Sequence, residues 1–222
     1  MPQKKHKNLL INVLINVVIP VVVLTRFSGE NYLGPLWGLV TALAFPVVYG
    51  IWDFAKERKV NFFSGLGFIS VLLTGGIGVL ELPTKWIVVK ETAVPLIIAT
   101  AILLSQKTRV PLVKTFFSEI FNLEKIQNGF KEPIGFEKML GRSTYFLTGA
   151  FLLSALLNFI LAVVIMNAEP GTAEYNQQLG KMTGLSFPVI VLPTVVVLTA
   201  VMYRMIEVIK KETGMEMEEY IK

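Results

Sequence analysis

The sequence predicts an all-α, polytopic membrane protein, and three observations lead to that fold class. Hydrophobic residues make up 53% of the 222 residues and charged residues only 17%, whereas a soluble chain carries about 25% charge. The apolar residues are gathered into segments near the ~20 residues that a spanning helix needs. The cations stand at the ends of these segments. We therefore expect a single membrane domain over residues 1–222, with little chain left for a soluble domain.

Six segments have the length and composition of transmembrane helices. The first follows a basic tail and has no small-residue cleavage site after it, so we expect an uncleaved helix rather than a signal peptide. Short connections join the helices in three hairpins: first with second, third with fourth, and fifth with sixth. The predicted helices cover residues 9–25, 32–52, 61–82, 86–105, 144–166 and 185–205.

The distribution of Lys and Arg predicts the orientation. Seventeen of the 21 Lys and Arg residues fall on one side of the six-helix arrangement. The other side holds Arg26, Lys85 and Lys181, and Lys90 lies within a helix. Because cytoplasmic loops carry the excess of positive charge, both termini are expected in the cytoplasm.

The connection after the fourth helix contains an amphipathic pattern. Val113, Phe116, Phe117 and Ile120 fall at i, i+3, i+4 and i+7, which places them on one helix face. An interfacial helix over residues 111–127 is therefore expected on the cytoplasmic face. Its Phe residues and nearby Lys residues favour contact with anionic lipid, and docking to a partner protein is the alternative.

The segment before the fifth helix and the tail after the sixth helix are expected to be irregular. The stretch Gly129–Gly141 has the composition of a turn-rich link. The sixth helix is expected to continue to near Glu212 and to stop at Gly214. The acidic run Met215–Tyr220 is expected to be a solvated face or a frayed end.

Lys90 and Glu91 are charged residues within an apolar segment, where each charge costs about 3 kcal/mol at the bilayer centre. Lys90 lies only one turn from Trp86, so its stem is expected to reach outward to the interface. Glu91 has a shorter side chain and is expected to face other helices or to pair with a lysine. Two roles stay open for this pair: structural anchoring, or contact with a substrate or proton.

Other polar and small residues mark helix faces. Asn12 and Asn16 share one face of the first helix, and Asn158 lies in the fifth. Interhelical hydrogen bonding and a pore lining are the two readings of these amides. The residues expected to permit close helix contacts are Gly34, Gly38, Ser70, Thr74 and Gly78.

The sequence lacks the residue sets of common enzymes. It has no Cys, a single His in the N-terminal tail and a single Asp. No phosphate-binding glycine loop or metal-binding motif is present. We therefore expect no enzymatic activity, no cofactor and no metal site. Nucleic acid is not an expected partner, because the basic residues stand at helix ends rather than forming a stripe.

The residues around the fourth helix carry a family resemblance. The run GLGFISVLLTGGIGVLELPTKWIVVKETAVPLIIATAILLSQKTRVPLV resembles the intracellular septation protein A family of bacterial inner-membrane proteins. The features shared with that family are Gly75 and Gly76, then Lys85, Trp86 and Lys90, then Ser105 and Gln106, then Pro111 and Leu112, and later Asn158. The resemblance covers residues 33–206. The longer amphipathic connection and the acidic tail depart from the family pattern, so the chain resembles a divergent branch.

The resemblance implies a role in cell-envelope integrity or division, exerted through contacts with lipids and envelope proteins, and it implies no catalytic residues. A small-molecule or lipid transporter with a site at mid-membrane polar groups is the alternative. The candidate ligand or transport residues are Lys90, Glu91, Asn12, Asn16, Asn158 and Gln106.

Overall fold

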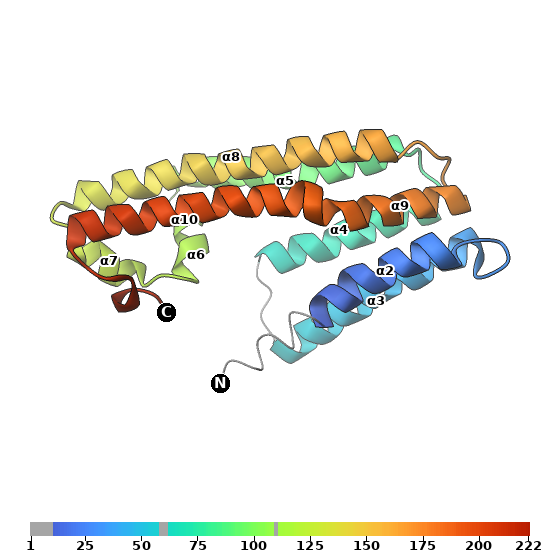
Figure 1. Cartoon of the computed structure of the whole chain (residues 1–222), viewed down its shortest axis with the longest axis horizontal. Helices are drawn as coiled ribbons and strands as arrows, with labels where there is room; N and C mark the ends of the chain where they lie inside the picture. The colour runs from blue at the N-terminus through green and yellow to red at the C-terminus, as the bar shows by residue number, and fades with distance from the viewer. Residues whose placement is uncertain (1–10, 58–61, 109–110) are drawn as a thin grey trace. The chain divides into compact units, whose positions relative to one another are not determined.

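The structure, a computed structural model, describes residues 11–57, 62–108 and 111–222 (Figure 1). Over these residues it is built of helices, with one isolated bridge between Phe121 and Ile221. The all-α class is therefore confirmed. The basic tail and the predicted start of the first helix at residue 9 lie outside the described residues.

Four of the described helices are long and apolar enough to cross a membrane, and two apolar helices are shorter. The four long ones are Gly34–Trp52, Lys85–Ser105, Pro133–Ile165 and Ala173–Thr213, and the shorter ones are Ile11–Phe27 and Gly67–Val79.

The full set of elements follows the chain order of Figure 1. They are η1 (Leu14–Val18), α2 (Ile19–Val22), η2 (Val23–Phe27), α3 (Gly34–Glu57), α4 (Phe62–Val79), α5 (Lys85–Ser105), α6 (Leu112–Ser118), α7 (Leu123–Gly129), α8 (Pro133–Ile165), α9 (Ala173–Ser186), η3 (Phe187–Val191), α10 (Leu192–Thr213) and η4 (Met217–Glu219). Here η1, η2 and η3 are π-helical turns and η4 is a 3₁₀ turn.

The chain divides into two compact units. The first comprises the chain up to Val94 together with Leu157–Ile190, and the second comprises Pro95–Leu156 and Val191–Lys222. The division falls within α5, α8 and η3 rather than at a linker.

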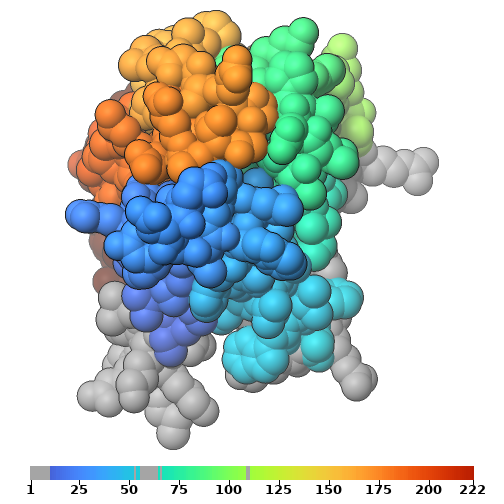
Figure 2. All heavy atoms as spheres, turned by 90° about the vertical axis from the view of Figure 1, so that its right-hand side faces the viewer, coloured from blue at the N-terminus to red at the C-terminus, as the bar shows by residue number. Residues whose placement is uncertain are grey.

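The first unit has one hydrophobic core. Its buried members come from segments far apart in the sequence: Leu24, Leu39, Ala42, Ile77, Ile87, Leu161, Ala162, Ile165, Met166, Ala168, Tyr175, Leu179, Met182 and Ile190. Figure 2 shows three of these segments side by side at one end of the unit, in blue near residue 30, green near 85 and orange near 170. Two hydrogen bonds hold this end together, from Thr84 Oγ1 to the Ala168 carbonyl (2.7 Å) and from Asn176 Nδ2 to the Pro35 carbonyl (2.7 Å).

The connection after α5 differs from the expectation. The prediction of a single helix over residues 111–127 is wrong. The structure has two helices there, α6 and α7, separated by a break over residues 119–122. Asn122 causes the break by capping α7, since its side chain accepts a hydrogen bond from the Lys125 N–H at 3.1 Å. Phe121 then pairs with Ile221 in the isolated bridge.

The turn-rich link predicted over Gly129–Gly141 is also wrong, because α8 begins at Pro133 rather than at residue 144. Proline suits the first turn of a helix, where its missing N–H has no helical partner. Phe136, Met139 and Leu140 then follow at i, i+3 and i+4 and are all buried. This apolar face stabilises the additional turns.

The sixth predicted helix begins twelve residues too late, at 185. The structure has α9 from Ala173, and helix continues through η3 and α10 to Thr213. Thr172 starts α9, because its side chain accepts a hydrogen bond from the Tyr175 N–H at 3.1 Å. Helix α9 is polar overall, yet it buries Tyr175, Leu179 and Met182 on the face that packs inward.

The carboxyl tail is docked rather than frayed. Helix α10 ends as expected at Gly214, which adopts a left-handed conformation with φ 71°. The tail then returns to the α6–α7 break, where Asn122 N–H donates to the Tyr220 carbonyl (2.7 Å) and Lys222 N–H donates to the Ile120 carbonyl (3.0 Å). Because Tyr220 is only 1% exposed, the tail belongs to the core of the second unit.

Large apolar side chains also cover the outer faces of the long helices. Leu104, Val164 and Val196 are 62%, 70% and 68% exposed, respectively. Exposed apolar surface of this extent is uncommon on soluble monomers and is typical of lipid-facing helices. The structure is therefore compatible with a membrane protein.

Candidate functional site

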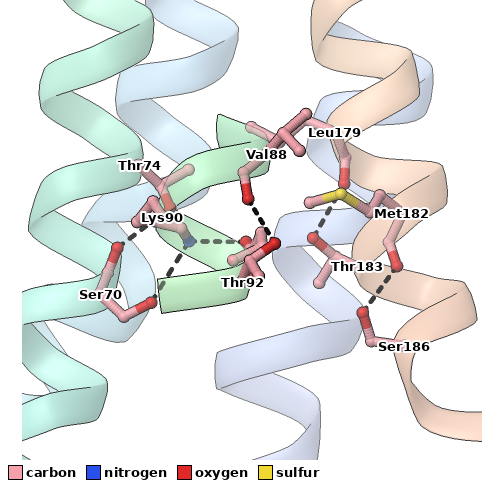
Figure 3. A network of polar contacts seen from close by, with 10 residues as sticks. Ser70, Thr74, Val88, Lys90, Thr92, Leu179, Met182, Thr183 and Ser186 are labelled. Carbon is pink, nitrogen blue, oxygen red and sulfur yellow. Dashed lines mark hydrogen bonds and ion pairs between the residues drawn. The ribbon is translucent and has the colours of Figure 1, made fainter. Parts of the chain in front are cut away.

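A buried lysine of α5, Lys90, reaches toward α4 within the first unit (Figure 3). Lys90 Nζ lies 2.6 Å from Glu91 Oε1, and the two side chains are 7% and 23% exposed, respectively. The same ammonium donates hydrogen bonds to Thr74 Oγ1 at 2.8 Å and to Ser70 Oγ at 3.3 Å. The three N–H donors of the ammonium therefore have three acceptors from the chain itself.

Helix α4 places these acceptors. Ser70 and Thr74 are four residues apart and so lie on the same helix face. Thr74 donates its own hydroxyl proton to the Ser70 carbonyl at 3.0 Å. This bond orients the Thr74 oxygen so that its lone pairs are available to Lys90.

The position of Lys90 corrects the expectation that its stem reaches outward to the interface. The side chain points inward to α4 instead, because two hydroxyls and a neighbouring carboxylate compensate the ammonium for the water it loses. Glu91 pairs with Lys90 itself, although adjacent residues on a helix point in different directions. The length of the lysine side chain allows it to curl back.

Other hydroxyls near this pair are bonded within their own helices. Thr92, Thr183 and Ser186 each donate to the carbonyl four residues earlier, at 2.8 to 2.9 Å (Figure 3). Such bonds satisfy the hydroxyl without a partner helix.

The predicted asparagines lie on helices other than α4 and α5. Asn16 Nδ2 donates to Asn12 Oδ1 at 3.3 Å, so these two amides bond along one helix face. Asn158 lies half-buried on α8 in the first unit. Gln106 belongs to the second unit, where its Nε2 lies 3.2 Å from the place that a Cβ on Gly141 would take. Asn12 and Asn16 are therefore bonded to each other, and Lys90 is bonded to Ser70, Thr74 and Glu91.

The small residues divide into two kinds. A Cβ on Gly38 would stand 2.9 Å from the Ser28 Cα, and one on Gly78 would overlap Leu39, so both permit close approach. Gly34 was expected to do the same, but a Cβ there would meet nothing within 4 Å. Its φ of 71° shows instead that it provides a left-handed turn at the start of α3.

The polar contacts of α9 were not predicted from the sequence. Asn176 is 2% exposed and holds the start of α3, and Gln178 Oε1 accepts the N–H groups of Asn167 and Ala168 at 2.8 and 2.9 Å. The available signal was Thr172 followed by Glu174, which is the composition of a helix start. Among the described residues, no group of three or more acidic or His side chains could hold a metal ion.

Comparison of the chain with protein-family models, with curated proteins and with solved structures finds no match. The class that the structure defines is an all-helical protein with several helices able to cross a membrane.

Proposed function

We propose that the chain is an integral protein of the bacterial cytoplasmic membrane that crosses it six times, with both termini in the cytoplasm. The four long apolar helices support this topology, and the two shorter ones, Ile11–Phe27 and Gly67–Val79, supply the remaining spans. The excess of Lys and Arg on one side of this arrangement sets the orientation.

We further propose that the protein has no enzymatic activity and supports cell-envelope integrity or division, through contacts with membrane lipids and envelope proteins. One observation favours this proposal over a transport function: all three N–H donors of the Lys90 ammonium are taken up by Ser70, Thr74 and Glu91. A substrate would have to displace one of these acceptors to reach it. Saturated buried groups fix the packing of neighbouring helices, which is what a scaffold requires. The resemblance to the septation protein A family is the reason for proposing a role in the cell envelope.

Complementation tests this proposal. In a bacterial strain lacking the native gene, we expect altered cell length or septum spacing, which the wild-type chain restores. The Glu91→Gln variant is expected to restore it as well, provided that its membrane abundance is normal, because an amide still accepts a hydrogen bond from Lys90. Normal division and an intact envelope in the deletion strain would contradict the proposal.

A transporter remains the second candidate, and a specific feature favours it. The π-helical turns η1 and η3 adjoin Pro20 and Pro193 in α2 and α10. Interrupted helices of this kind occur at transporter binding sites. Transport predicts that Glu91→Gln abolishes complementation at normal abundance, so the same experiment separates the two candidates.

A further inference from the structure

A groove of about 500 Å³ lies in the second unit, between the first half of α8 and the second half of α10. The two helices run side by side there (Figure 1). Its charged lining residues are Lys131, Lys138, Arg142, Arg204, Lys211, Glu132 and Glu212. Five of these are cations and two are acids, so the groove carries an excess of positive charge.

Four of the five cations have no carboxylate partner in the part of the chain that the structure describes. Lys131, Lys138, Arg142 and Lys211 form no ion pair with any carboxylate of the described residues. Arg204 lies 3.7 Å from Glu207, on side chains that are largely exposed.

Three Lys residues elsewhere in the same unit do have carboxylate partners. Lys114 lies 3.2 Å from Glu137, and Lys210 lies 2.8 Å from Glu216. Among the described residues of this unit, four cations without a carboxylate partner therefore line the groove. The groove keeps a net positive charge, because five cations face only two acids in its lining.

The floor of the groove is apolar. Met139, Val201 and Met205 are buried beneath it, and Phe146 is 57% exposed at its edge. The cations of α8 recur at seven and eleven residues after Lys131, which places them along one face of the helix. The groove thus offers cations beside a hydrocarbon surface.

We propose that this groove binds an anionic phospholipid, with its headgroup phosphate among Lys138, Arg142 and Lys211 and the start of an acyl chain on the floor near Phe146. Arg and Lys are the residues that bind phosphate oxygens. The inference rests on the proposed orientation, which places this end of α8 and α10 at the cytoplasmic leaflet, where anionic lipids attract basic residues.

The combination of features favours a lipid over other anions. Free inorganic phosphate would use the cations and leave the apolar floor exposed to water. An acidic protein segment would have to enter beside helices whose outer faces are apolar. A phospholipid uses the charged and the apolar parts of the groove together.

Native mass spectrometry of the full-length protein in a neutral detergent tests the proposal. Apparent dissociation constants are measured for dioleoylphosphatidylglycerol and for dioleoylphosphatidylcholine, which differ in headgroup charge. We expect phosphatidylglycerol to bind at least tenfold more tightly. The double variant Lys138→Gln/Arg142→Gln is expected to lose at least tenfold in affinity for phosphatidylglycerol and to keep its affinity for phosphatidylcholine.

Two further variants make the result specific. Lys107→Gln/Lys125→Gln removes the same charge outside the groove and is expected to change the affinity by less than twofold. Glu132→Gln removes an acid from the groove and is expected to raise the affinity for phosphatidylglycerol, a gain that misfolding would not produce.

Several outcomes would overturn the inference. Equal affinity for the two lipids, or equal losses in the two double variants, would show that the groove is not a headgroup site. Competition by inorganic phosphate at equal concentration would indicate a site for the free anion, and competition by a glutamate-rich peptide would indicate a protein partner. The complementation result is independent of all of these, so the proposed function is tested separately.

Discussion

At the scale of the residue, the Lys90–Glu91 pair predicts an asymmetric response to substitution. Lys90→Met removes the cation and leaves a carboxylate, 23% exposed, without its partner. Loss of one member of a fully buried pair costs about 3–5 kcal/mol, and because Glu91 is partly exposed we expect the lower end, about 3 kcal/mol, or roughly 10 °C in Tm for a chain of this size. The double variant Lys90→Met/Glu91→Gln is expected to recover most of the loss, because no unpaired charge remains. Thermal unfolding in detergent measures both, and an equal loss in both variants would show that the charge pair is not the cause.

Two glycines predict opposite effects of the same substitution. Gly38→Ala places a Cβ 2.9 Å from the Ser28 Cα, a backbone atom that cannot rotate away, so a loss of about 2 kcal/mol is expected. At Gly76 a Cβ would meet nothing within 4 Å. Gly76→Ala is therefore expected to stabilise α4 by up to about 1 kcal/mol, the difference in helix propensity. Unfolding temperatures of the two variants check the difference in sign.

At the scale of the element, the docked tail predicts a pH dependence. Burial, aided by the carboxylates of Glu216 and Glu218, raises the pKa of Tyr220 above its ordinary value of about 10. The folded tail therefore favours the neutral phenol. Its contribution to stability is complete below pH 10 and is lost as the pH rises above that value. Limited proteolysis of the tail against pH should show this loosening.

Tyr220→Phe is the matched control for that prediction. The hydroxyl is buried without a hydrogen-bond partner among the described residues, so its removal is expected to cost little at neutral pH. The ring contact with Phe121, at 6.0 Å between centroids, is kept. The variant should resist the alkaline loosening, and an unchanged pH profile would assign the effect to another group.

Element boundaries show how far the sequence predicts this fold. The apolar runs identify the long helices, because hydrophobicity over about 20 residues is a local property. The start of α8 was missed although Pro133 and the spacing of Phe136 and Met139 indicate it, since the nearby glycines suggested a turn. The course of the tail depends on a bridge between Phe121 and Ile221, a hundred residues apart in the sequence, and no local pattern predicts such a contact.

The candidate site shows the same limit. Lys90 and Glu91 are recognisable in the sequence because charge within an apolar run is rare. Ser70 and Thr74 are recognisable as a small-residue face of α4. That these residues meet depends on the rotation of α4 against α5, which is determined by packing between helices. For the same reason the cations of the groove were predicted only as residues of the cytoplasmic side.

At the scale of the whole molecule, the proposed topology makes a prediction that this chain is well suited to test. The sequence has no Cys, so a single introduced cysteine is labelled without background. Glu30→Cys and Glu169→Cys alter exposed residues in the connections η2–α3 and α8–α9. Both are expected to react with a membrane-impermeant maleimide in intact cells, because six spans with cytoplasmic termini put these connections outside.

Glu124→Cys, on the exposed side of α7, is the matched control and is expected to react only after the membrane is permeabilised. Glu30 and Glu169 lie in the connections of two different hairpins. In a chain with four spans, at least one of them would lie on the same side of the membrane as Glu124 and would be labelled only after permeabilisation. Labelling of Glu124→Cys in intact cells would show that the orientation is the opposite of the one proposed. In that case the cations between α8 and α10 would face the outer leaflet, and the lipid site would lose the argument from the cytoplasmic surface while its charge and apolar floor remained.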